Sequence, residues 1–192
     1  MKAKIQSRIS KKLSVKGIIL VTMALFAFAN CSDSEDSTDD LLLGFLAGGG
    51  GSQPSFRAYI SANQTMPNTG LTKINYDTED FDGSDQFDAT NSVFRPTESG
   101  TWFLFAHSQT SNTEDQRRIN HAFYRNGVLI SNGDQIYGSR TGATSLAATI
   151  QDTVQVSPGD SIEVRFFHDF AGSEPLLGGS TVTWFSGYRI SK

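Results

Sequence analysis

Cysteine is almost absent from this chain: Cys31 is the only one among 192 residues. A lone cysteine cannot form a disulfide within the chain, so crosslinks do not stabilise the fold. Long hydrophobic runs are also missing. The longest, residues 18–29, is interrupted by Thr22, and a helix of twelve residues is about 18 Å long, shorter than the ~30 Å hydrocarbon core of a bilayer. The run therefore does not predict a transmembrane helix.

Catalytic signatures are lacking as well. The sequence contains neither a Gly-x-Ser-x-Gly nucleophile elbow nor a glycine-rich phosphate loop. Its three histidines, His107, His121 and His168, fall on separate predicted strands, whereas a zinc site needs closer clustering or thiolates. We therefore expect a protein that is not an enzyme, with histidines that are hydrogen-bonded by their neighbours.

The N-terminus has the pattern of a secretory signal. Residues 1–17 contain six lysines and arginines and no acid, and the short apolar run follows. The sequence Phe28-Ala29-Asn30-Cys31 resembles a lipobox, with Phe28 and Asn30 where Leu and a small residue are usual. We therefore expect residues 1–30 to be a lipoprotein-type signal peptide and acylated Cys31 to anchor the chain in a lipid bilayer. Ordinary cleavage nearby, which would leave Cys31 free or remove it, is the alternative.

Removal of this signal makes the chain strongly acidic. The whole chain has 16 lysines and arginines against 20 acids; without the six bases of the signal, ten bases face 20 acids, a formal net charge of −10. Nucleic acids and anionic lipid surfaces attract basic proteins. The charge therefore excludes nucleic acid as a partner and leaves the acyl chains as the means of attachment. We expect the protein in the cell envelope, at the outer membrane or cell surface.

Residues 31–53 have the composition of a linker. Five acids lie between residues 32 and 40, and Gly48–Ser52 is a glycine run, so we expect a disordered tether. The short apolar segment 41–47 is either a sticky part of this tether or a short helix that bundles with copies of itself.

Residues 54–192 have the period-two patterning of a β domain. Apolar and polar residues alternate along several stretches, such as residues 162–166, and turn sequences such as Asn126-Gly127 separate them. One stretch has two apolar faces, because Trp102 and Leu104 point one way while Phe103 and Phe105 point the other. A sandwich needs only one apolar face per sheet, so the second face predicts a subunit interface. We assign to it Phe103, Phe105, Phe167 and Phe185.

The spacing of aromatic residues, one aspartate and one glycine resembles the signature of the C1q globular-head domain. The run is Tyr76-x5-Asp82-x4-Phe87-x6-Phe94-x5-Gly100-x-Trp102-x-Leu104, and Phe185-Ser186-Gly187-Tyr188 resembles the family's closing segment. Where the family has other aromatics, this chain has Tyr76, Trp102, Leu104 and Ala106. The resemblance covers nearly all of residues 54–192. It implies an all-β, C1q/TNF-like jelly-roll sandwich of two antiparallel sheets and about ten strands, which forms a homotrimer. No Gly-X-Y run precedes the domain, so a collagen stalk is not expected.

Three segments are candidates for binding. Asp80, Asp82 and Asp85 are weak Ca²⁺ candidates, although the segment does not have the ligand order of an EF-hand and also fits a solvated turn. Apart from this possible Ca²⁺, we expect no cofactor. Two loops could carry recognition; their candidate residues are Glu114, Asp115, Arg117, Arg118, Leu176 and Leu177. A solvated loop and local packing are the alternatives for these.

The sequence as a whole predicts a membrane-anchored, trimeric, non-catalytic recognition or adhesion module. Its partners would be itself, the lipid bilayer and an extracellular protein or glycan. The alternative is a structural protein of an envelope layer that binds no foreign ligand.

Overall fold

A computed structural model describes residues 54–192 except 69, 113 and 139–144; the predicted signal, tether and Cys31 lie outside the described residues. The described part contains 14 strands and no helix long and apolar enough to cross a membrane. The strands are β1 (Ser55–Tyr59), β2 (Gln64–Met66), β3 (Thr72–Lys73), β4 (Thr78–Asp82), β5 (Phe87–Asp88), β6 (Val93–Phe94), β7 (Gly100–Gln109), β8 (Arg118–Arg125), β9 (Val128–Asn132), β10 (Ile136–Tyr137), β11 (Ala147–Val156), β12 (Ile162–His168), β13 (Glu174–Leu176) and β14 (Trp184–Ser191). The all-β prediction is confirmed, with more strands than the ten expected because several are only two or three residues long.

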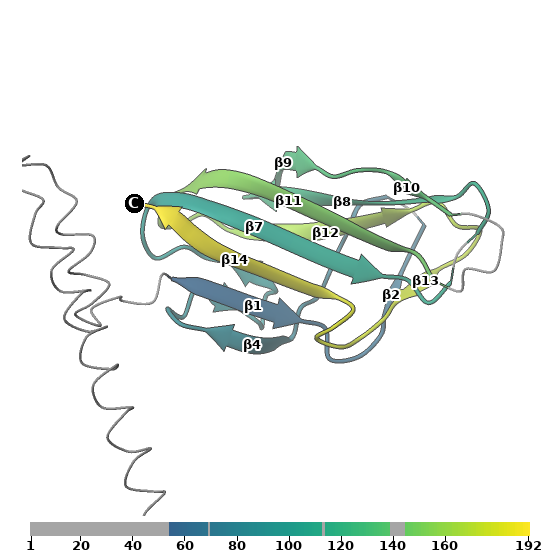
Figure 1. The fold of residues 1–192 in the computed structure, drawn as a ribbon, viewed down its shortest axis with the longest axis horizontal. Helices are drawn as coiled ribbons and strands as arrows, with labels where there is room; N and C mark the ends of the chain where they lie inside the picture. Colours follow the sequence, from purple (N-terminus) through teal and green to yellow (C-terminus); the bar gives the residue numbers. More distant parts are fainter. Residues whose placement is uncertain (1–53, 69, 113, 139–144) are drawn as a thin grey trace, which may run out of the picture. The chain divides into compact units, whose positions relative to one another are not determined.

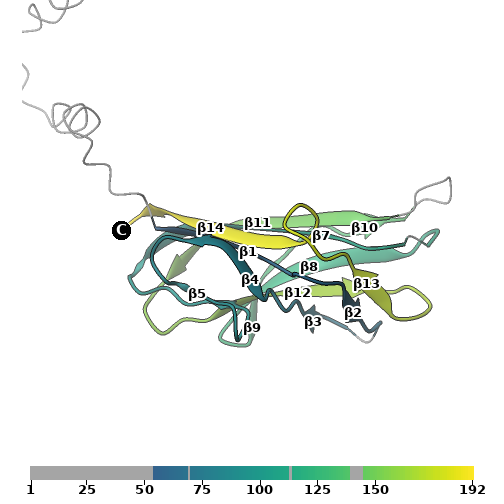
Figure 2. The same ribbon diagram turned by 90° about the horizontal axis from the view of Figure 1, so that it is seen from below.

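The strands form two antiparallel sheets that lie face to face (Figure 1, Figure 2). The first sheet has the order β11-β7-β14-β1-β4. The second has the order β10-β8-β12-β6-β5, with β3 also paired to β12 and β9 to β8. A separate pair, β13 and β2, lies at one end of the sandwich. This arrangement confirms the predicted sandwich of two antiparallel sheets.

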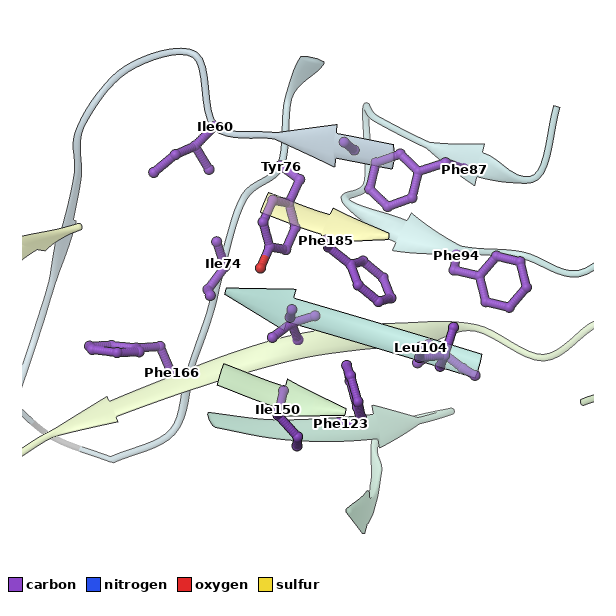
Figure 3. Close-up of a cluster of buried hydrophobic side chains, with 14 of the residues drawn as sticks. Ile60, Ile74, Tyr76, Phe87, Phe94, Leu104, Phe123, Ile150, Phe166 and Phe185 are labelled. Carbon is purple, nitrogen blue, oxygen red and sulfur yellow. The ribbon is translucent and has the colours of Figure 1, made fainter. Parts of the chain in front are cut away.

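Aromatic side chains fill the space between the sheets (Figure 3). Phe56 of β1 lies among them: its ring stacks on Phe94 at 4.9 Å and on Phe87 at 5.3 Å, and meets the ring of Phe185 edge-on at 5.0 Å. All four side chains are buried. Burying one such side chain contributes roughly 1.5–3 kcal/mol, so this cluster contributes substantially to the packing of one sheet on the other.

The inward position of Phe185 corrects the prediction that it belongs to a subunit interface. On β14 the side chain of Phe185 points into the core and is fully buried, while Trp184 and Tyr188 point outward. The sequence shows that residues of this strand alternate between two faces, but the prediction took the wrong face as the inward one. The reason is that three large apolar residues, Trp184, Tyr188 and Ile190, share the outward face. The inward face instead carries Phe185 and Gly187, and Gly187 lies where a neighbouring ring needs space.

The hairpin turn that the sequence predicts at Asn126-Gly127 is present between β8 and β9. Asn126 and Gly127 both have positive φ, 53° and 78°, as two-residue hairpin turns require. The Asn126 side chain also donates a hydrogen bond to Asp160 at 2.8 Å. The turn is thereby attached to the loop that precedes β12.

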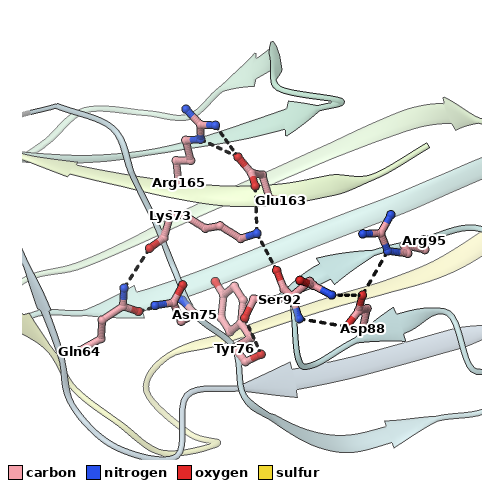
Figure 4. Close-up of polar contacts among 10 residues, drawn as sticks. Gln64, Lys73, Asn75, Tyr76, Asp88, Ser92, Arg95, Glu163 and Arg165 are labelled. Atoms are coloured by element: carbon pink, nitrogen blue, oxygen red, sulfur yellow. Dashed lines mark hydrogen bonds and ion pairs between the residues drawn. The ribbon is translucent and has the colours of Figure 1, made fainter. Parts of the chain in front are cut away.

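Charged residues fasten the short strand β3 to the second sheet (Figure 4). The Lys73 ammonium lies 3.1 Å from the Glu163 carboxylate, which also pairs with Arg165 at 2.6 Å. Burial alone would raise the pKa of Glu163, but hydrogen bonds from Arg165 and Lys73 outweigh it and lower the pKa. Arg165 in turn lies 3.9 Å over the ring of Tyr124.

The two ends of the described chain lie at the same end of the sandwich (Figure 1). Ser55 is opposite Tyr188 in the β1–β14 pairing, and the Arg189 amide donates to the Pro54 carbonyl at 3.0 Å. The segment that precedes residue 54 therefore joins the domain beside its C-terminus.

Gly187→Ala is expected to destabilise the fold by about 1–3 kcal/mol through overpacking. A Cβ atom at this position would lie 2.7 Å from both Leu104 Cδ2 and Phe56 Cε1. Gly172 has no atom within 4 Å of such a Cβ, so Gly172→Ala is the matched control. Urea unfolding measures both; equal midpoints for the two variants would contradict the packing described.

Candidate functional site

The outer face of the first sheet carries a strip of aromatic side chains, which we call the aromatic face. It consists of Phe103 and Phe105 of β7 and Trp184 and Tyr188 of β14. Phe105 stacks on Trp184 with ring centroids 5.0 Å apart, and Phe103 lies 5.4 Å from Tyr188, its cross-strand partner. Because β7 and β14 have neighbours on both sides, the strip runs along the middle of the sheet. The prediction that Phe103 and Phe105 point outward is correct.

Residues around the aromatic face extend it on one side and limit it on the other. Arg57 lies 4.8 Å over the Trp184 ring and forms an ion pair with Asp80. Phe81 of β4, the cross-strand partner of Arg57, is 50% exposed on this side. Ile190, two residues after Tyr188 on β14, is 52% exposed. On the opposite side, β11 presents small and polar residues; these are Ala147, Thr149, Gln151, Thr153 and Gln155.

Phe167 does not belong to this face, which corrects its predicted place in an interface with Phe103 and Phe105. It lies on β12 in the second sheet, and the Arg118 guanidinium is 5.1 Å from its ring. The sequence shows which residues of a strand point to the same side, but it does not show to which sheet the strand belongs.

The charged loop before β8 is fastened to the loop after β12. The Glu114 carboxylate accepts the Ala171 amide proton at 3.1 Å and lies 3.7 Å from Arg117. The Arg118 amide donates to Asp169 Oδ1 at 2.7 Å, and the Arg118 side chain pairs with the same carboxylate at 3.3 Å. Of the predicted binding residues in this loop, only Asp115 and Arg117 are exposed.

Leu176 and Leu177 pack against the rest of the domain and do not project into solvent as a binding loop would. Leu176 is fully buried in β13, so its prediction as a ligand-contacting residue is wrong. Leu177 is half-buried, and its amide donates to the Gln109 carbonyl at 2.8 Å. The proline and glycines around them suggested an open loop, but Leu176 is the last residue of β13, which pairs with β2, and its side chain belongs to the hydrophobic core.

The predicted calcium candidates have other partners. The Asp82 carboxylate accepts amide protons from Ser84, Gln86 and Phe87 and so shapes its own loop, while Asp80 pairs with Arg57. Burial and the neighbouring carboxylates raise the pKa of Glu79. Among the described residues, no group of three or more acidic, histidine or cysteine side chains is placed to hold a metal ion. The carboxylates of Asp80 and Asp82 are therefore engaged in contacts within the fold.

A serine–histidine pair, which the sequence did not reveal, connects the two sheets. Ser108 Oγ of β7 lies 2.7 Å from His121 Nε2 of β8, and both residues are fully buried. Burial, with a smaller contribution from the charge of His107, lowers the pKa of His121 to about 3. Because neither side chain has exposed surface, no substrate can reach the pair. We interpret it as a structural contact.

The second sheet carries a small cavity on its outer side, which we call the amide cavity. Its volume is about 170 Å³, and its lining residues are Leu71, Arg118, Asn120, Asn132, Gln135 and Phe167. Asn120 donates to the Gly133 carbonyl at 2.9 Å, and Gln135 Oε1 accepts from Arg118 at 2.7 Å. Apart from Arg118, sequence reasoning pointed to none of these lining residues, since they come from distant segments of the chain.

Comparisons with known proteins identify the fold. No family model matches the chain, and no curated protein matches it either. Among solved structures, the globular domain of a zebrafish complement 1qA protein is similar with a TM-score of 0.53 at 13% identity, covering 72% of this chain and 98% of that one. Murine APRIL, of the TNF family, is similar with a TM-score of 0.56 at 10% identity, covering 72% of this chain and 100% of its own. Identities this low establish the fold alone: the chain has a C1q/TNF-like jelly-roll fold.

The buried histidine predicts a pH-dependent stability. The unfolded chain binds a proton at His121 below pH ~6.5, whereas the folded protein does not until about pH 3. The unfolded state therefore binds more protons in this window, and the free energy of unfolding falls by about 1.4 kcal/mol for each pH unit below ~6.

Urea unfolding between pH 7 and pH 4 tests this. His121→Gln should flatten the dependence, and His107→Gln, which leaves His121 in place, should keep it. The same pH slope in both variants would contradict the assignment to His121.

Proposed function

We propose that the chain is a lipid-anchored, homotrimeric, non-catalytic ligand-binding module displayed on the cell envelope, at the outer membrane or the cell surface. The aromatic face carries this proposal. Phe103 with Tyr188 and Phe105 with Trp184 form two ring pairs on the same face of the sheet, and the Tyr188 residue is 50% exposed. Monomeric soluble proteins rarely leave a large continuous apolar patch in contact with water.

Copies of this chain are the occupant that best fits the aromatic face. Its rings are on β7 and β14, and both strands already pair with a neighbouring strand on each side. A partner must therefore cover the side chains of the face, because it cannot add a strand here. The resemblance of the sequence to the C1q globular head implies a threefold assembly. Three aromatic faces around one axis would bury each other in a closed ring, without leaving one copy uncovered.

Recognition without catalysis fits the chemistry of the described residues. The candidate nucleophile–base pair, Ser108 and His121, is sealed in the core. The charged residues of the loop before β8 hold loops together through short contacts such as Glu114 to Ala171. A rigid scaffold of this kind suits a binding module, and three copies would raise the apparent affinity for a repeated ligand through avidity. The ligand would be an extracellular protein or glycan.

Anchoring rests on the sequence before the domain. The basic and apolar residues 1–30, followed by Cys31, favour acylation at that cysteine. Residues 31–53 would then connect the bilayer to Pro54, which lies beside the C-terminal strand β14.

Phe105→Asp should convert the trimer to a monomer, because it places a charge among the rings of the aromatic face at the subunit interface. Leu129, which is 47% exposed on β9 of the second sheet, offers the matched control Leu129→Asp, which should remain trimeric. Light scattering after size exclusion gives the masses, and circular dichroism verifies that both variants are folded. A monomeric wild-type chain at micromolar concentration would rule out the trimer.

Cys31→Ala should release the protein from membranes. The substitution removes the thiol that carries the acyl chains, and a chain of net charge −10 after signal removal has no electrostatic attraction to anionic lipid. Fractionation and detergent-phase partitioning of cells that express each form measure the release, with Ser32→Ala as control. A variant that still partitions into detergent would exclude the lipid anchor.

A further inference from the structure

The amide cavity is built on rigid elements. Arg118 and Asn120 lie on β8, which pairs with both of the other strands involved. Asn132 ends β9, and Phe167 lies on β12. Strands β8 and β12 are paired along seven residues, so these positions are fixed relative to one another. Its volume of about 170 Å³ is below the roughly 300–1,000 Å³ typical of pockets for drug-sized ligands. The cavity therefore suits one small ring rather than an extended molecule.

Two of its amide groups are already oriented. The Asn120 amide nitrogen donates to the Gly133 carbonyl at 2.9 Å, which turns its oxygen away from that contact as a free acceptor. Gln135 Oε1 accepts from Arg118 at 2.7 Å and from the Tyr137 hydroxyl at 3.2 Å, which leaves its NH₂ group as a donor. An acceptor and a donor held ready in this way lose little conformational entropy when a ligand binds.

Amide groups beside an apolar floor match one ligand chemistry. Each hydroxyl of a sugar both donates and accepts, and asparagine and glutamine side chains can satisfy both roles. The C–H faces of the same ring need an apolar surface, which Phe167 and Leu71 supply. Arg118 covers one side of the Phe167 ring at 5.1 Å, so a ligand would contact the part that faces the cavity.

The charges near the cavity favour a neutral ligand. Arg118 is its only charged lining residue among those described, and the Asp169 carboxylate lies 3.3 Å from its guanidinium. An opposite charge this close largely cancels the field that Arg118 would otherwise offer to an anion. A carboxylate or phosphate would therefore gain little here.

We propose that the amide cavity binds a single neutral pyranose ring, as the terminal sugar of a glycan. This inference rests on the proposed function, since it names the ligand class of the binding module and where that ligand binds. The cavity is lined by residues of β8, β9 and β12 in the second sheet, whereas the aromatic face is on β7 and β14 of the first. Figure 2 shows these two sheets as separate layers. An assembly closed through the aromatic faces leaves three cavities open to solvent.

Saturation-transfer difference NMR on the full chain tests the proposal, with the methyl pyranosides of glucose, galactose, mannose and N-acetylglucosamine as probes. At least one should receive saturation at its ring protons, with a dissociation constant in the millimolar range. Gln135→Ala and Asn132→Ala should weaken binding at least fivefold. Asn75→Ala, an exposed asparagine outside the cavity, is the matched control and should bind as the wild type does.

Two results would overturn the assignment of the cavity, and a third would overturn the class of ligand. One is the absence of saturation transfer to every neutral probe, and the other is transfer that Gln135→Ala and Asn132→Ala leave unchanged. Preferential binding of methyl glucuronide would overturn the neutral class. A parallel screen of the trimer against glycans and extracellular proteins distinguishes two outcomes: that the cavity is not the sugar site, and that the protein is not a ligand-binding module. A ligand captured equally by wild type and Gln135→Ala retains the module and rejects the cavity, whereas a blank screen rejects both.

Discussion

The contact between Phe56 and Gly187 sets how closely the strands of the first sheet approach the core. The Phe56 ring lies so near the Gly187 backbone that a methyl group there would meet it at 2.7 Å. This close approach lets Phe56 reach Phe87 and Phe94, which come from the second sheet. The attachment of the two sheets therefore depends on one position without a side chain. Interiors packed at this density adapt poorly to added volume, so the position tolerates little change.

The same alternation that fills the core determines what the two outer faces can do. On β7, Trp102 and Leu104 enter the core, which leaves Phe103 and Phe105 to face outward beside Trp184. On β8 the inward side chains include His121 and Phe123, and the outward ones include Asn120. The middle of the first sheet consequently presents rings, and the outer side of β8 presents Asn120 and Arg118. The two faces suit two different kinds of contact, one with copies of the chain and one with a polar ligand.

Much of the fold could be predicted from the sequence, because its information is local. Alternation along residues 102–107 gave the correct inward and outward faces of β7, and Asn126-Gly127 gave the correct hairpin turn. Phe185 was misassigned because both faces of its strand carry large apolar residues, so that alternation alone could not say which is inward. Leu176 was misjudged because the strand that covers it lies about 110 residues earlier in the chain, at Gln64–Met66.

The candidate sites were harder to predict for the same reason. The aromatic face combines two strands that are neighbours only in the folded sheet, and Phe103 and Phe105 alone suggested it. The amide cavity combines side chains from residue 71 to residue 167, and asparagine and glutamine have no motif that marks them as ligands. Charged residues drew attention to the loop around Glu114, but their charges are used within the fold. A site formed by segments that are far apart in the sequence can be identified only once the three-dimensional structure is known.

The position of β1 has a mechanical consequence. Any tension that arrives through the chain before residue 54 enters the domain at Ser55, the first residue of β1. This strand is held on both sides, by β14 in unbroken register and by β4 with one register shift between Arg57 and Ala58. Hydrogen bonds in an antiparallel ladder lie across the strand, so a pull along β1 loads both rows together in shear instead of opening them one at a time. The domain thus takes up force at a strand that is well suited to resist it.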